Sequence, residues 1–200
     1  MTTTTGIDRS MPAAPFGRAA ALGLTAALGL AAVLGLAPPA HAQVVSPYAG
    51  EEARAIKALS EDEVREYLEG EGMGWAMAAE LNHYPGPRHA IDLADSLGLS
   101  AVQRDSLRDI HGRMNARAVE LGSTIVAREA DLDGAFAEGT IDAAELDALV
   151  AEIAELQGRL RSTHLMAHLE TRAALSPHQV AMYDRLRGYG GGADHADHAH

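Results

Sequence analysis

The fold is decided by one short motif that occurs twice, as Leu175-Ser176-Pro177-His178-Gln179 and earlier as Leu99-Ser100-Ala101-Val102-Gln103. Each copy is typical of a helix start, because the Ser hydroxyl accepts a hydrogen bond from a free backbone N–H of the first turn. The Gln three residues later reaches back to the N–H of the Ser and completes a capping box. The capping residues Ser100, Gln103, Ser176 and Gln179 therefore mark two helix starts. A third, weaker copy occupies residues 59–63.

Between the two motifs the sequence predicts a long antiparallel helical hairpin. Apolar residues recur every three or four positions from Ser100 to Phe136, and the same period resumes between Asp142 and Ala174. The polar stretch at 138–140 predicts the turn. Helices of about 35 and 32 residues would each span roughly 50 Å. Each buries only one apolar stripe, so we expect short flanking helices or a second copy of the chain to cover the rest, and we predict a homodimer.

Three glycines interrupt the first long helix, at positions 112, 122 and 134. Each weakens a helix by about 1 kcal/mol relative to Ala. We therefore expect Gly112, Gly122 and Gly134 to allow bending or a close approach of another helix.

Short helices are predicted before the hairpin, in the region 43–98. Ser60 begins the first of them, residues 73–81 form the second, and residues 88–97 form the third. Between the last two, the Tyr-Pro-Gly-Pro stretch at 84–87 predicts a turn, because proline fixes φ and glycine relaxes it.

Composition limits the class of protein. Of 200 residues, 47% are hydrophobic but only 4% are aromatic, a mixture that favours an all-α fold. The formal net charge is −12, which excludes nucleic-acid binding through a basic patch. There is no cysteine, so thiolate metal sites and disulfides are excluded.

The first 42 residues are typical of a targeting segment. A polar stretch with two arginines precedes an uncharged run of Ala, Leu and Gly at 19–37, and Ala40-His41-Ala42 follows two prolines. Small residues at Ala40 and Ala42 fit a signal-peptidase cleavage site, which would make Gln43 the first mature residue. The apolar run is also close to the length of a membrane span, so a retained anchor is the alternative. Either way, we expect an exported, periplasmic protein.

Two histidines in the second long helix are candidate metal ligands. His164 and His168 are four residues apart, so a helix places both imidazoles on one face. If the turn centres near residues 139–140, antiparallel pairing of the two long helices places His111 opposite His168, and Met114 opposite residue 165. Imidazole and thioether ligands suit Zn, Cu, Ni or Co. The alternatives are two solvated or hydrogen-bonded histidines, and a Met114 that only packs in the core.

The C-terminal tail, residues 190–200, is a second candidate. It carries His195, His198 and His200 between acidic residues and could chelate transition metals weakly, or simply be a solvated tail. Histidines 83, 89 and 178 have the pattern of ordinary surface residues.

Catalytic motifs are missing from the sequence. There is no G-x-S-x-G, no Walker A motif, and no H-E-x-x-H, since Leu165 stands where that zinc-protease motif needs Glu. We therefore predict that the chain is not an enzyme.

The paired Leu-Ser-x-x-Gln motifs resemble the signature LTxxQ of the Spy/CpxP family, with Ser in place of Thr. The resemblance covers about residues 99–189, and the stretch 164–169 leading into the second motif is similar to the branch of periplasmic heavy-metal sensor and resistance proteins. It implies a kinked hairpin that dimerises into a cradle. It also implies one of three roles: metal sensor or buffer, inhibitor of envelope-stress sensor kinases, or ATP-independent chaperone.

Three functions are therefore expected. The first is periplasmic metal binding in heavy-metal sensing or resistance and in the envelope-stress response. The alternative is an ATP-independent chaperone that holds partly unfolded client proteins. The third is an adaptor that docks on the sensor domain of a membrane kinase.

Overall fold

The computed structural model describes residues 45–189, and this part of the chain is all-helical, as predicted. A 3-10 turn at Glu51–Ala53 precedes six α-helices: α1 Glu61–Glu69, α2 Met77–Glu80, α3 Pro87–Asp92, α4 Ala101–Glu138, α5 Ala143–Ala174 and α6 Pro177–Arg187. No β-strand occurs in this range. Nor does any of its helices combine the length and the apolar character needed to cross a lipid bilayer. The targeting segment with Ala40 and Ala42, and the tail with His195, His198 and His200, lie outside the described residues.

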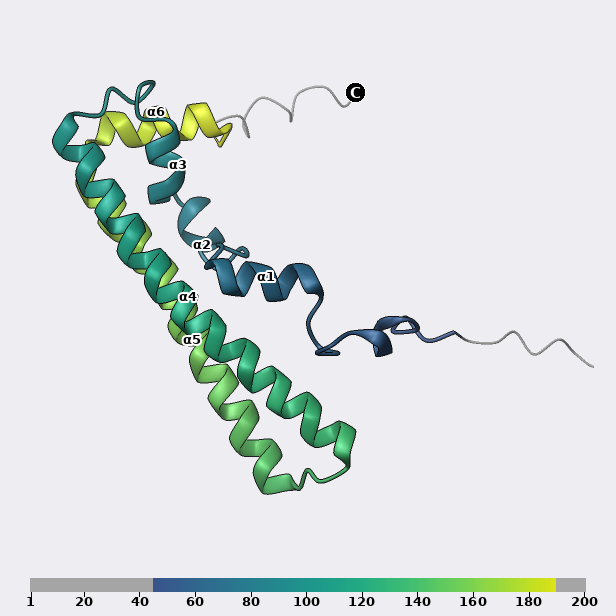
Figure 1. The fold of residues 1–200 in the computed structure, drawn as a ribbon. Helices are drawn as coiled ribbons and strands as arrows, with labels where there is room; N and C mark the ends of the chain where they lie inside the picture. Colours follow the sequence, from purple (N-terminus) through teal and green to yellow (C-terminus); the bar gives the residue numbers. More distant parts are fainter. Residues whose placement is uncertain (1–44, 190–200) are drawn as a thin grey trace, which may run out of the picture. The chain divides into compact units, whose positions relative to one another are not determined.

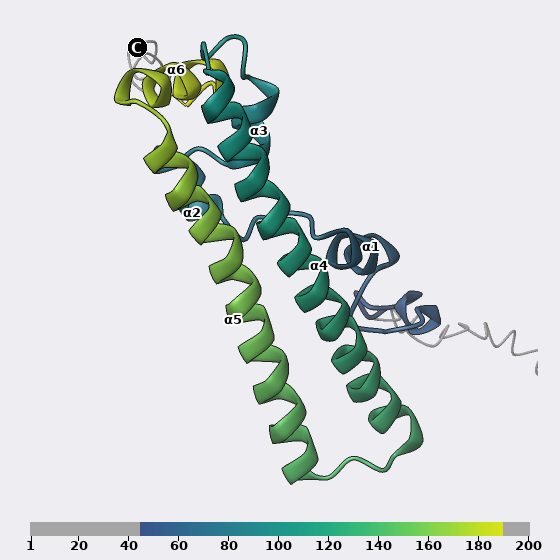
Figure 2. The ribbon, with the colours of Figure 1, turned by 60° about the vertical axis from the view of Figure 1, so that its left-hand side comes forward.

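The two long helices form the predicted hairpin. α4 has 38 residues and α5 has 32, and they run side by side in both views (Figures 1 and 2). Gly139 ends α4 in the left-handed conformation with φ 65°, which glycine adopts without the steric cost of a side chain. Asp142 then begins α5 by accepting hydrogen bonds from two backbone N–H groups of its first turn.

The repeated motif forms full capping boxes at Ser100 and Ser176, as predicted, and at Ser60 as well. The two glutamines also meet across the fold. Gln103 Nε2 donates to Gln179 Oε1 at 2.9 Å, and Gln179 Nε2 donates to Gln103 Oε1 at 3.2 Å. This pair ties the start of α4 to the start of α6 at the open end of the hairpin.

Two apolar clusters hold the helices together. The first lies at the open end, where α3 and α6 contact the long helices (Figure 1), and contains Ala90, Ala94, Leu97, Leu99, Leu107, Ile110, Ala167, Leu175, Val180 and Tyr183. The second lies further along the hairpin, where α1 contacts α4, and contains Leu59, Tyr67, Ala118, Leu121, Ile125, Leu156 and Leu160. Residues 111–115 of α4 lie between the two clusters.

Of the three glycines in α4, only Gly122 permits a close contact. A Cβ added at Gly122 would lie 2.1 Å from the carbonyl oxygen of Tyr67, so α1 reaches α4 only because no side chain is present. Added Cβ atoms at Gly112 and Gly134 meet nothing within 4 Å.

The short helices are shorter than predicted. The helix expected over 73–81 is confined to α2, because Met73 and Gly74 have φ values of 41° and 74°, which a right-handed helix cannot include. The helix expected over 88–97 ends at Asp92. The loop from Leu81 to Gly86, between α2 and α3, contacts α5, where His168 and Arg172 lie within hydrogen-bond distance of the carbonyls of Tyr84 and His83.

Candidate functional site

A cavity of about 260 Å³ lies between the two apolar clusters and is lined by four histidines. His89 comes from α3, His111 from α4, and His164 and His168 from α5. Met114 of α4 lines the same cavity. The structure therefore brings together all four residues that the hairpin register had placed at one level, which are His111, Met114, His164 and His168.

His164 is the most constrained of these residues. Its side chain is buried, with the residue only 3% exposed, and its Nε2 has no hydrogen-bond partner among the described residues. Leaving a buried polar atom unpartnered costs about 1–3 kcal/mol, so such an atom calls for an explanation. Burial lowers the pKa of His164, and the neighbouring His168 lowers it further. The ring is therefore neutral near pH 7 and has a lone pair free for a ligand.

His168 is held in one orientation. Its Nδ1 lies 2.7 Å from the carbonyl oxygen of Tyr84, and because a carbonyl only accepts, Nδ1 carries the proton and donates. The lone pair is then on Nε2. A Cβ added at Gly86 would lie 3.2 Å from this Nε2, so the glycine of the Tyr-Pro-Gly-Pro turn keeps that atom clear. A fixed tautomer with a free Nε2 is the usual arrangement of a histidine that binds a metal.

His89 lies at the surface of α3, as predicted, with its side chain 44% exposed, but it has a further role in the cavity. It lines the cavity, and burial lowers its pKa, with the charge of Arg187 acting in the same direction. No spacing in the sequence connects His89 with α5; only the turn at 84–87, after which α3 contacts both long helices, could have indicated it.

Met114 has the core position that one of its two interpretations predicts, and it also borders the histidines. It packs, half-buried, against the first apolar cluster and also lines the histidine cavity. Its thioether is thus available at the boundary between the core and the imidazoles.

Polar residues at the rim of the cavity were also missed from the sequence. Arg88 pairs with Glu71 at 3.0 Å, and Asn115 donates to the carbonyl of Glu69 at 2.9 Å. These contacts fasten the loop after α1 to α3 and α4, and all three side chains Glu71, Arg88 and Asn115 line the cavity.

The imidazoles share the cavity without converging on one point. Within residues 45–189, no group of three or more His, Asp or Glu side chains is placed to hold a metal ion as the side chains stand. The cavity therefore offers two imidazoles on successive turns of α5, those of His164 and His168. The other two, His89 and His111, line the same cavity.

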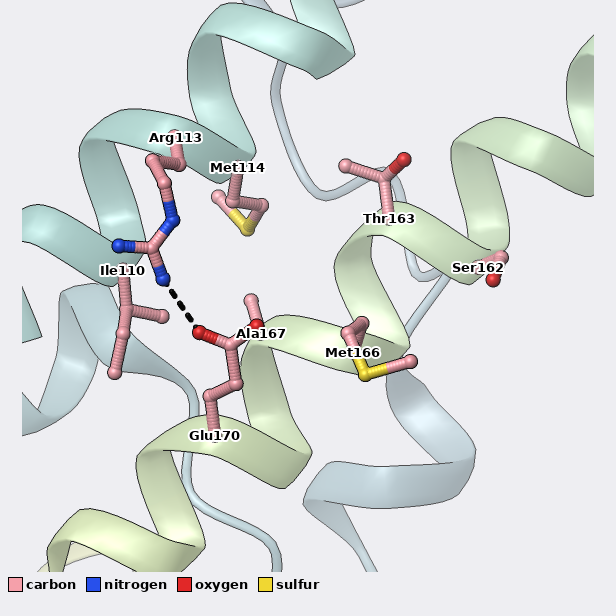
Figure 3. Close-up of a pocket in the computed structure, with 8 residues that line it drawn as sticks. All are labelled: Ile110, Arg113, Met114, Ser162, Thr163, Met166, Ala167 and Glu170. Carbon is pink, nitrogen blue, oxygen red and sulfur yellow. Dashed lines mark hydrogen bonds and ion pairs between the residues drawn. The ribbon is translucent and has the colours of Figure 1, made fainter.

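A second cavity, of about 320 Å³, also opens between α4 and α5 but contains no histidine. Figure 3 shows its charged side chains, Arg113 and Glu170, joined to each other, at a distance of 2.6 Å. Met114 extends from α4 toward α5 and lines this cavity as well (Figure 3). Because Arg113 and Glu170 neutralise each other in this second cavity, the histidine cavity is the better candidate site.

Comparison with protein families gives one match. Residues 72–182, more than half of the chain, match the family model described as heavy-metal resistance. The matched range contains α2 to α5, most of α6 and every residue that lines the histidine cavity except Gly70 and Glu71. No curated protein and no solved structure is significantly similar to the chain. The family match does not favour the chaperone alternative.

Proposed function

Because the chain belongs to the heavy-metal resistance family, a Spy/CpxP-like family, we propose that it is a non-enzymatic protein that binds a transition metal in the histidine cavity. The ligands in this proposal are Nε2 of His164 and Nε2 of His168, with His111 and the thioether of Met114 turning in to complete the set. Imidazole and thioether ligands select Zn, Cu, Ni or Co over Mg or Ca.

One observation carries the proposal. The Nε2 atom of His164 is buried without a partner among the described residues, in a cavity that three further histidines line. A metal ion would supply the missing partner, and a neutral imidazole is the form that binds it.

Calorimetric titration of the untagged protein with Zn²⁺, Cu²⁺, Ni²⁺ and Co²⁺ tests the proposal. We expect a dissociation constant below about 100 μM for at least one of these ions. The double substitution His164→Ala and His168→Ala should abolish that binding. The matched control is His83→Ala with His178→Ala, which removes two exposed histidines outside the cavity.

Binding that persists after the double substitution contradicts the proposed site. Replacement of His195, His198 and His200 by Ala then decides whether the tail is the binding segment instead. Loss of binding only in this tail variant would transfer the metal-binding role to residues 190–200.

We propose further that the protein acts in heavy-metal sensing or resistance, and in the envelope-stress response, after export to the periplasm. The targeting segment at 1–42 supports this location. Cell fractionation with N-terminal sequencing tests it, and a periplasmic protein that begins at Gln43 is the expected result. Co-purification with a membrane sensor kinase, with and without metal, tests whether such a kinase is its partner.

A further inference from the structure

One buried carboxylate connects α2 with the C-terminal helix. Glu80 is the last residue of α2, and its side chain is 12% exposed. Its Oε1 accepts hydrogen bonds from the hydroxyls of Tyr183, at 2.5 Å, and Tyr189, at 2.9 Å. Nε of Arg187 lies 3.4 Å from the same oxygen. Three side chains of α6 and the residues just after it therefore meet on one oxygen atom.

The same carboxylate lies beside three residues that line the histidine cavity, Gly86, His89 and His168. Its Oε2 accepts the backbone N–H of Gly86 at 3.2 Å and lies 3.7 Å from Nδ1 of His168. Nδ1 of His89 lies 3.8 Å from Oε1. Nδ1 of His168 donates to the Tyr84 carbonyl, so Glu80 lies beside this ring as a neighbouring charge and not as its hydrogen-bond partner.

The contacts of Glu80 with α6 are strong enough to hold it in place. Tyr183 is fully buried, and burial, followed by the hydrogen bond to Glu80, raises its pKa, so the phenol remains a donor. Arg187 also donates to the hydroxyl of Tyr189 at 3.2 Å, which joins the two residues that contact Glu80 from the end of α6. A charge-assisted hydrogen bond is roughly twice as strong as a neutral one.

We propose that Glu80 is a positioning residue for the cation site, and that binding of a divalent cation in the histidine cavity strengthens the attachment of α6 to the hairpin. The inference rests on the proposed function. Glu80 accepts the backbone N–H of Gly86 and so holds the loop whose Tyr84 carbonyl orients His168, in the way that outer-shell groups orient metal ligands. A cation in the cavity would in turn attract the carboxylate of Glu80. This attraction favours the position in which the hydroxyls of Tyr183 and Tyr189, together with Arg187, already hold that carboxylate. Because such coupling is reciprocal, the cation and α6 stabilise each other.

Amide hydrogen exchange of the full protein, with and without Zn²⁺, tests the proposal. We expect Zn²⁺ to slow exchange in α6 about tenfold, within the usual range of coupling between sites. The amides of α1 are the internal reference, because α1 contacts α4 and none of the hydrogen bonds and ion pairs of Glu80 involves α1. α1 therefore reports the stabilisation that a bound ligand gives without the contribution of Glu80. The slowing in α6 should exceed that in α1.

Two variants separate positioning from mere stability. Glu80→Gln keeps the size of the side chain but removes its charge, and we expect Zn²⁺ affinity to fall about tenfold and the excess slowing of α6 to disappear. Tyr189→Phe removes one partly buried hydroxyl that donates to Glu80, and should reduce the excess slowing to about threefold even if Glu80→Gln does not fold. Glu170→Gln is the matched control, because it neutralises a carboxylate of α5 that pairs with Arg113 away from the cavity.

The outcomes are distinguishable. If Zn²⁺ binds but α6 slows no more than α1, or exchanges faster, the coupling is overturned while the metal site stands. Excess slowing that survives Glu80→Gln also overturns it. If calorimetry detects no binding of Zn²⁺ to the unaltered protein, the proposed function fails and the coupling fails with it.

Discussion

At the scale of single residues, the burial of His164 makes the stability of the fold sensitive to acid. Burial lowers its pKa in the folded protein, whereas the unfolded chain has the ordinary value of about 6.5. The unfolded chain therefore takes up the proton first as the pH falls, which favours unfolding. The contribution of His164 to stability is complete above about pH 6.5 and is lost as the pH drops toward the folded-state pKa.

We expect the free energy of unfolding to decrease below pH 6.5 by up to about 1.4 kcal/mol per pH unit for this histidine. His89 contributes in the same direction, because burial also lowers its pKa. Urea unfolding at pH 7.5 and pH 5.5 measures the difference. His164→Leu should flatten this dependence and the exposed control His178→Leu should not; equal slopes in the two variants would contradict the account.

The residues of the site differ in how well sequence reasoning could find them. The spacing of His164 and His168 and the position of the turn were enough to place His111 and Met114 beside them. His89, Glu71 and Glu80 belong to short helices and loops, whose positions depend on tertiary contacts and not on a repeating pattern. Glu80 in particular has no signal in the sequence, since its neighbours Tyr183 and Tyr189 lie about a hundred residues away.

At the scale of helices, the contact of α1 with α4 depends on Gly122. An added methyl group would collide with the backbone oxygen of Tyr67, which cannot move without shifting α1. We expect Gly122→Ala to lower the free energy of unfolding by at least about 2 kcal/mol, as for overpacking in a core. Chemical denaturation measures this effect.

Gly112→Ala is the matched control for that prediction. The same methyl group meets nothing within 4 Å at this position, so only the helix propensity changes. Its expected effect is a gain of about 0.5–1 kcal/mol. Equal effects of the two substitutions would show that α1 is not held as described.

The long helices were predictable because each has its own start signal, a regular apolar stripe and a polar turn. The capping boxes formed as expected, and only the pairing of Gln103 with Gln179 was not foreseen. A capping motif specifies local hydrogen bonds, whereas the meeting of two such motifs depends on how α6 folds back. The predicted extent of the helix over 73–81 was wrong, because Met73 and Gly74 have positive φ values that an apolar pattern does not reveal. The helix predicted over 88–97 ends at Asp92.

At the scale of the whole molecule, we propose that the predicted homodimer forms through an apolar face on α2 and α5. Met77, Leu81 and Leu169 are 60%, 57% and 50% exposed, and the hollow that Met77 and Leu81 line shares Ala78 with the hollow that Leu169 lines, so exposed apolar side chains gather on this face. They adjoin a nearly apolar hollow lined by Ala78, Ala79, Tyr84, Leu165 and Leu169.

Sedimentation equilibrium tests this proposal. Leu169→Glu should weaken association at least about tenfold, because a buried unpaired charge is costly in an interface. Val102→Glu is the control, since Val102 is 79% exposed in the first turn of α4 and lies away from the face. A monomer at all concentrations, or equal effects of the two variants, would refute the proposed interface.

The closed end of the hairpin projects beyond both apolar clusters. No residue between 126 and 152 is buried, and Phe136 and Val150 are 58% and 48% exposed. The loop at 139–142 is therefore remote from the cavity, from α6 and from the glutamine pair that closes the other end. A fluorescent reporter spliced into this loop would leave the remaining architecture intact, so the protein could be tracked in living cells while its histidines stay accessible to metal.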